Sequence, residues 1–198
     1  MRRKIRSGSD SLSPLLCAGL LPCLVLLGAA AAPPGQADRF TADGRLRPPS
    51  DYREWVFLSS GLDMAYTDNP ATTGHAVFDN VFVDPASWTA FKATGHWPDG
   101  TVFILENRLG ASQGSINRQG HFQSGEVLGL EAHVRDTTRF KGGWGFYALN
   151  GDGPARMIDR TAACYACHEA HGALDTTFTQ FYPVARAIAV KAGTWQDR

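Results

Sequence analysis

The stretch Cys164-Tyr165-Ala166-Cys167-His168 restricts this chain more than any other part of its sequence. Two cysteines three positions apart lie on one face of a helical turn, so both thiols can reach the two vinyl groups of one porphyrin. The histidine that follows directly can then bind the iron. The pattern therefore predicts one c-type haem, attached covalently through Cys164 and Cys167, with His168 as the axial metal ligand.

Two other uses of the cysteine pair fit less well. A structural zinc site needs four ligands, and the sequence after residue 37 has no second cysteine pair. A thioredoxin-like dithiol is typical near a βαβ unit, whereas only 30 residues follow His168. We therefore favour haem over a zinc site or a redox dithiol.

Residues 1–37 begin with a basic stretch, continue with an apolar core and approach their end through a run of alanines. This is the pattern of a secretory signal and predicts an exported, periplasmic protein. Cleavage after Ala32 and cleavage after Ala37 fit equally well. An uncleaved anchor is the less favoured alternative, because Pro22 interrupts the apolar run. Cys17 and Cys23 would leave with the signal, so no cysteine remains for a structural disulfide.

The rest of the chain divides into a polar leader or linker, 38–50, and one domain, 51–198. The signal holds four basic residues and one acid, so the remainder carries 15 Lys and Arg against 18 Asp and Glu. This balance argues against nucleic acid as a partner.

The domain has strand patterns before the motif and helical patterns around and after it. Asp84 as N-cap and Pro85 at the first helical position predict a helix that ends near Gly95. The short apolar run 55–58 fits either a strand or a helix end. Strands are predicted at 76–83, 101–106, 128–135 and 144–149, and a closing helix, broken or started by Pro183, at 178–191. The expected fold class is α+β, mainly an antiparallel sheet with a few helices and the haem motif on a late helix.

The late position of the motif narrows the class of cytochrome. Small electron-transfer cytochromes carry the motif early and supply a methionine ligand downstream, but no methionine follows His168. The four-helix cytochromes carry it late, but the region before this motif is not heptad-patterned. Further blocks occur in order, Tyr52–Val56, Val83–Pro85, Asp99–Val102, Gly129–Ala132, Trp144–Tyr147 and Phe178–Pro183. With the motif, they resemble the cytochrome P-460 family and its relatives, the cytochromes c′-beta.

The resemblance implies an antiparallel sheet, a homodimer, and a haem iron held by one histidine with its opposite face open or bearing water. Better-known members oxidise hydroxylamine and form an extra lysine–porphyrin bond in the strand after the Asp-Gly-Thr turn. Leu105 stands at the matching position, and neither Lys92 nor Lys141 fits the motif. We therefore expect no cross-link, which removes a main reason to assume enzymatic hydroxylamine oxidation. The cytochromes c′-beta also lack the bond and resemble gas-binding proteins with an apolar distal pocket.

Candidate pocket residues follow from the strand patterns. Phe103 and Leu105 share one strand face and, with Phe78 or Phe82, are predicted to cover the haem, although aromatic strand residues are more often plain core. Arg186 is a weaker candidate, which the resemblance matches to a family arginine in the closing helix, either as partner of a haem propionate or on the proximal side of the haem. Carboxylate candidates are Glu106 and Glu131, with solvent or a salt bridge as the simpler role. A sixth iron ligand is weighed, and not favoured, for Met64, Met157, His75, His96, His121, His133 and His171.

These patterns predict an exported mono-haem cytochrome with a five-coordinate iron that binds or transforms NO or hydroxylamine. An apolar covering without a proton relay favours small neutral ligands over catalysis that needs a general base. The alternative is an electron-transfer cytochrome with a hidden sixth ligand and a redox partner protein. A hydroxylamine oxidoreductase is the third possibility.

Overall fold

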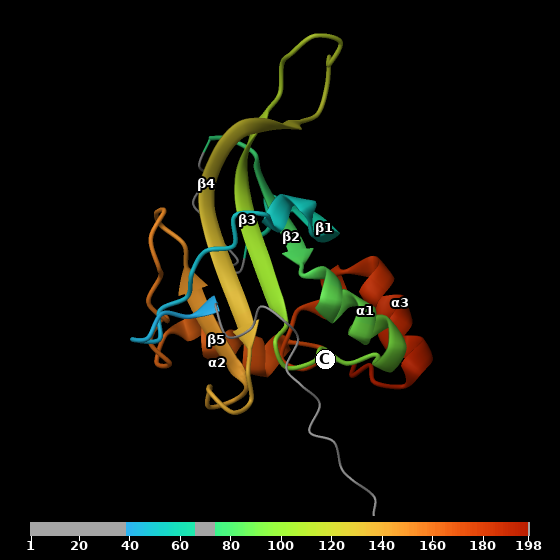
Figure 1. Cartoon of the computed structure of the whole chain (residues 1–198). Coiled ribbons are helices and arrows are strands. Elements are labelled where there is room, and N and C mark those ends of the chain that lie inside the picture. The colour runs from blue at the N-terminus through green and yellow to red at the C-terminus, as the bar shows by residue number, and fades with distance from the viewer. Residues whose placement is uncertain (1–38, 66–73, 198) are drawn as a thin grey trace, which may run out of the picture. The chain divides into compact units, whose positions relative to one another are not determined.

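A five-stranded antiparallel sheet forms the centre of the domain, and strands adjacent in sequence are adjacent in the sheet (Figure 1). The computed structural model describes residues 39–65 and 74–197, so the predicted signal lies outside the described residues. In chain order the main elements are η2 (Tyr52–Glu54), β1 (Val56–Leu62), β2 (Val77–Val83), α1 (Pro85–Thr94), β3 (Val102–Ala111), β4 (Phe122–Arg135), β5 (Trp144–Ala148), α2 (Ala163–His171), η3 (Thr179–Phe181) and α3 (Pro183–Ala192).

The predicted α+β class is confirmed, and in the run 55–58 the residues after Trp55 belong to strand β1, whereas Trp55 caps η2. Cys164, Cys167 and His168 of the motif all lie on α2. Pro183 starts the closing helix at its first position. Within the described ranges, no helix has the length and apolar character needed to cross a bilayer.

Asp84 sets the start of α1, as its sequence predicts. One carboxylate oxygen accepts the Ser87 amide at 2.9 Å, which satisfies a free N–H of the first turn. The other accepts the Val102 amide at 2.9 Å and so ties the helix to β3. Gly95 ends the helix with φ 74°, a left-handed conformation that glycine adopts without strain.

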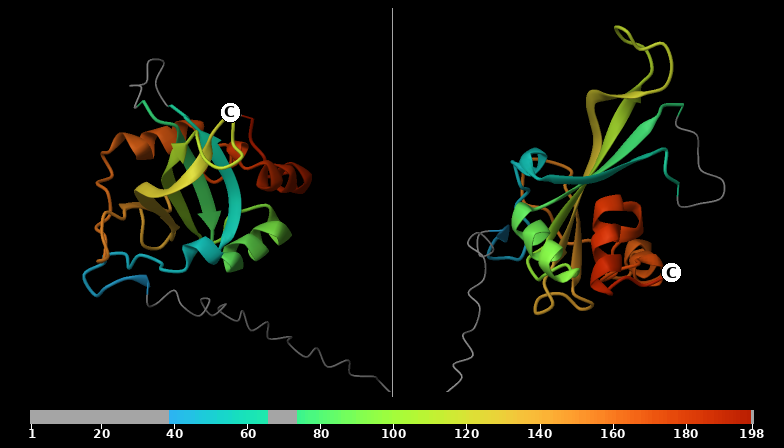
Figure 2. Two further views of the ribbon diagram at one scale, coloured as in Figure 1. Left: turned by 90° about the horizontal axis from the view of Figure 1, so that it is seen from above. Right: turned by 90° about the vertical axis from the view of Figure 1, so that its right-hand side faces the viewer.

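The sheet is apolar on both faces, and each face has its own core. One core packs β-strand side chains against α1, α2 and α3, with Phe91, Phe103, Phe146, Tyr165 and Ala185 among its members. The other lies beneath the chain start and η2, and includes Leu46, Tyr52, Ile104, Ala132 and Tyr147. In Figure 2, α2 and α3 lie on one side of the sheet and the segment from residue 39 through η2 on the other.

The β3–β4 hairpin is longer than its sequence predicts. It extends past the other strands, where its loop projects from the domain (Figure 1). The outer parts, 107–111 and 122–129, pair with each other through two register shifts. They contain glycine and polar residues in place of alternating apolar ones, so they form by backbone pairing and leave little signal in the sequence.

Candidate haem site

A cavity of about 1090 Å³ separates α2 from one face of the sheet. The Cys164 and Cys167 side chains and the His168 imidazole all line it. Both cysteines are half-buried free thiols, since no disulfide joins them. The helical spacing of the motif therefore brings Cys164, Cys167 and His168 to one cavity.

His168 is held in one orientation by a backbone carbonyl. Its Nδ1 lies 3.0 Å from the Thr176 carbonyl oxygen, which can only accept, so Nδ1 carries the hydrogen and donates it. The Nε2 lone pair is then available to a metal. Burial, with the nearby His133, lowers the pKa of His168 to about 4, so the imidazole is neutral at pH 7.

The Thr176 carbonyl belongs to a tight turn, Leu174–Thr177, closed by the Thr177 amide on the Leu174 carbonyl at 2.7 Å. Asp175 and Thr176 both have positive φ, 47° and 57°, as a type I′ turn requires. This conformation is uncommon for a β-branched residue such as Thr176. The surrounding structure must therefore hold the turn in place.

Two tryptophans fix the turn from outside. The Trp97 amide donates to the Asp175 carboxylate at 2.9 Å, and the Trp144 indole donates to the Asp175 carbonyl at 2.9 Å. Just before this turn, the backbone at Gly172 passes very close to α2 and to the turn itself. A Cβ on Gly172 would lie 2.5–2.7 Å from backbone atoms of His168, Thr176 and Thr177. Only glycine fits this approach.

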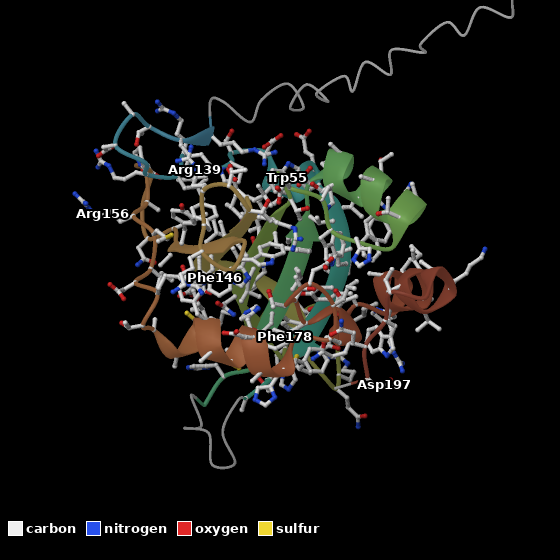
Figure 3. All side chains as sticks on the ribbon, turned by 90° about the horizontal axis from the view of Figure 1, so that it is seen from below. Trp55, Arg139, Phe146, Arg156, Phe178 and Asp197 are labelled. Carbon is white, nitrogen blue, oxygen red and sulfur yellow. The ribbon has the colours of Figure 1, made fainter. Side chains whose placement is uncertain are left out.

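The sheet side chains that line the cavity form three rows across the strands. Each row, called a rank below, consists of residues paired with each other on neighbouring strands. The first rank is Phe103, His133 and Phe146, the second is Val81, Leu105 and Glu131, and the third is Asp79 and Asn107. His168 packs on the first rank, with ring centroids 4.7 Å from Phe146 and 5.0 Å from His133. Phe178, 4.2 Å away, contacts the same imidazole. Figure 3 shows Phe146 and Phe178 beside α2.

The predicted pocket residues divide between the two faces. Phe103 and Leu105 line the cavity. Phe78 and Phe82 point to the opposite face, where Phe82 packs edge-to-face on Tyr52 with centroids 5.7 Å apart. They do not line the cavity, because the odd-numbered residues of β2 face it. Arg186 is exposed on α3, with its guanidinium 5.2 Å from the Trp195 ring centroid, and it does not line the cavity either.

The two carboxylate candidates are also on different faces. Glu106 is buried on the far face among Tyr52, Arg53 and Arg108. Glu131 lines the cavity, and its Oε2 lies 3.8 Å from His133 Nε2. Contact with His133 lowers the pKa of Glu131 in spite of its partial burial, so this carboxylate is ionised at pH 7.

Four of the seven candidate sixth ligands line the cavity, namely Met64, His75, His121 and His133. Met157, His96 and His171 do not. His133 touches His168 edge-on, which leaves no room for an iron and its porphyrin between the two rings. Met64, His75 and His121 lie beside the ends of β1, β2 and β4 that are farther from the first rank.

A model of the cytochrome P460 family matches residues 49–179, about two thirds of the chain. The chain belongs to the cytochrome P460 family. The match contains the whole sheet and α2, and it ends before α3. A comparison with curated proteins gave no match. Membership implies a haem cofactor.

The residues of this cytochrome P460 domain fit a haem. Two free thiols, a neutral imidazole with Nδ1 engaged, and an apolar wall border one large cavity. A separate metal ion has no comparable site, since the described ranges hold no group of three or more His, Cys, Asp or Glu suited to one.

No lysine lines the cavity of this cytochrome P460 domain within the described residues. Of the two lysines weighed for a cross-link, Lys92 lies on α1 and Lys141 in the turn before β5. The strand position expected to carry a cross-linking lysine is Leu105, which does face the cavity.

Sequence reasoning missed the outer polar part of the cavity. Asp63, Asp79 and Asn107 line it together with Met64 and His121. The signal for two of them was available in the alternation of strand side chains. Asp79 is two residues from Val81, and Asn107 is two residues from Leu105, so each shares a face with its neighbour.

Proposed function

We propose that this cytochrome P460 domain holds one haem in the cavity between α2 and the sheet and binds NO there, with hydroxylamine as a second ligand. Cys164 and Cys167 would form the thioether bonds, and His168 would bind the iron through Nε2. A bound haem would supply an iron whose open position takes a small ligand. The protein would be exported to the periplasm.

The placement of the potential sixth ligands carries this proposal. His168 packs on the first rank, whereas Met64 follows β1 beyond the Gly61–Asp79 pair, at the level of the third rank. Successive ranks are about 7 Å apart along a strand. His75 and His121 lie at that same distant end. The nearer wall holds Val81, Phe103 and Leu105, which have no atom that ligates iron, together with Glu131. His133 also lies there, but its ring is against His168 itself.

The spectrum of the reduced protein tests the coordination. We expect a high-spin, five-coordinate ferrous iron that binds CO and NO without displacing a protein group. Variants Met64→Ala and His121→Ala should leave that spectrum unchanged. A low-spin ferrous spectrum that does not respond to CO would contradict the proposal.

Covalent attachment has its own test. Denatured, reduced protein in alkaline pyridine should show the band of a haem with two saturated vinyl groups. Cys164→Ala should move the band toward the position of a single thioether. Extraction of haem from the wild-type protein by acid acetone would contradict attachment through either cysteine.

Electron transfer is the second candidate, and it is favoured by the presence of Met64 and two further imidazoles in the cavity lining. If one of them binds iron, the reduced protein is low-spin and loses that spectrum in the corresponding alanine variant. The same pair of measurements therefore decides between the two functions.

A further inference from the structure

Three carboxylates line the cavity that would hold the haem. Glu131 is in the second rank, and Asp79 is in the third, where its Oδ1 accepts a hydrogen bond from the Asn107 side chain. Asp63 lies where β1 ends, and its side chain accepts the Val77 amide at 2.8 Å. These hydrogen bonds hold the charges of Asp63 and Asp79 at fixed places near the wall.

Among the described residues, no Lys or Arg on the cavity surface balances these charges. The sequence itself has no Lys or Arg anywhere between Arg53 and Lys92, a stretch that supplies β1, β2 and the residues that connect them. Among the described residues of the lining, imidazoles are the only groups that can become positive.

We propose that Asp63, Asp79 and Glu131 make this cavity select neutral iron ligands, such as NO and hydroxylamine, against anions such as nitrite and azide. This inference rests on the proposed function, because it concerns ligands of the same iron. It adds a substrate class, namely uncharged ligands. Nitrite, an anionic product of nitrogen-oxide chemistry, would be repelled, while NO or hydroxylamine would enter without an electrostatic barrier.

The expected size of the effect follows from Coulomb's law. Two unit charges about 10 Å apart, at an effective dielectric constant of about 20, interact strongly enough to change a dissociation constant roughly tenfold. Salt screens part of this interaction near the cavity opening. Each carboxylate should therefore weaken azide binding roughly three- to tenfold and leave an uncharged ligand unaffected.

The test compares azide binding to the ferric holoprotein with CO binding to the ferrous holoprotein at pH 8, by optical titration. The variants are Asp63→Asn, Asp79→Asn and Glu131→Gln. Asp152→Asn is the matched control, because it removes the same charge from an exposed bend outside the cavity. A non-coordinating salt series on the wild-type protein accompanies them and needs no variant to fold.

We expect each cavity variant to raise the ratio of azide affinity to CO affinity three- to tenfold, and Asp152→Asn to leave the ratio within twofold of wild type. Rising salt should strengthen azide binding and leave CO binding unchanged. Wild-type protein that binds CO, with azide affinity insensitive to both salt and the variants, overturns the inference alone. A ferrous protein that does not bind CO overturns the proposed function and this inference with it.

Discussion

Leu105 faces the cavity, at the strand position that the resemblance matches to a cross-linking lysine. Its side chain has no nucleophile, and no lysine of the described chain lines the cavity. We therefore predict that the intact mass equals the processed chain plus one haem, and that only the Cys164–Cys167 peptide carries haem after trypsin. A second haem-linked peptide containing Lys92 or Lys141 would contradict this prediction and restore hydroxylamine oxidation as the leading function.

Leu105→Lys tests the same position from the other direction. The new amine would lie on the cavity wall beside Val81 and Glu131. We expect it to form a bond to the porphyrin under peroxide, with a red-shifted Soret band and a new haem-linked peptide. Val81→Lys, at the paired position on the neighbouring strand, is the control for the effect of an added amine elsewhere on the cavity wall.

At the scale of elements, the path of the chain after α2 determines the orientation of the His168 imidazole. Gly172→Ala would place a Cβ within 2.5–2.7 Å of backbone atoms, which cannot move as a flexible side chain can. We expect a loss of about 1–3 kcal/mol of unfolding free energy, together with an altered ligand spectrum because the Thr176 carbonyl shifts from Nδ1. Gly151→Ala, where a Cβ meets nothing within 4 Å, should change neither.

The link between α1 and β3 gives a second prediction at this scale. Asp84→Ala removes the acceptor of two buried amides, Ser87 N and Val102 N. An unpaired buried amide costs about 1–3 kcal/mol, and a lost N-cap about 1 kcal/mol. Urea unfolding should show a loss of at least about 2 kcal/mol. Asp84→Asn keeps one acceptor oxygen and should recover part of it.

The sequence predicted these elements where burial and capping leave a clear pattern. The start and end of α1 follow from Asp84, Pro85 and Gly95, and the central strands from their alternating apolar residues. The turn at Asp175 and Thr176 was not predictable, since type I′ turns are typically marked by Asn-Gly or Asp-Gly. Contacts from Trp97 and Trp144, distant in sequence, impose it instead.

At the scale of the whole molecule, Glu106 joins three parts of the fold. It accepts hydrogen bonds from Tyr52 and Arg53 of η2, from Asn80 of β2, and from Arg108 of its own strand. Burial alone would raise the pKa of Glu106, but these donors, led by Arg108, outweigh it and lower the pKa from 4.5 to about 2.

A folded-state pKa below the ordinary value means that the unfolded chain binds the proton more tightly. The stabilisation by Glu106 is therefore complete above about pH 5 and is lost as the pH falls toward 2, and it is on the order of 3 kcal/mol. Urea unfolding at pH 7 and pH 3 should show somewhat more than half of this loss, about 2 kcal/mol, in wild type. In Glu106→Gln the difference between the two pH values should shrink, whereas Glu126→Gln, at an exposed strand position, should behave as wild type.

The arrangement of the whole molecule explains which part of the site could not be predicted from the sequence. The motif predicts Cys164, Cys167 and His168 locally, but the side of the sheet that α2 covers is decided by the whole fold. Because both faces of the sheet are apolar, alternation groups Phe78 with Phe82 and Phe103 with Leu105 without showing which pair meets the motif. Only the packing of α2 and α3 settles it.

The turn that holds His168 also separates two events in the life of the chain. The proposed thioether formation would require accessible thiols on the protein side, and an unfolded segment around Cys164 would provide them. The carbonyl that orients the imidazole comes from residue 176 and is set by Trp97, some 70 residues before the motif. In the proposed haem protein, attachment could therefore precede folding, while His168 would be oriented toward the iron only once the tertiary structure has formed around the turn.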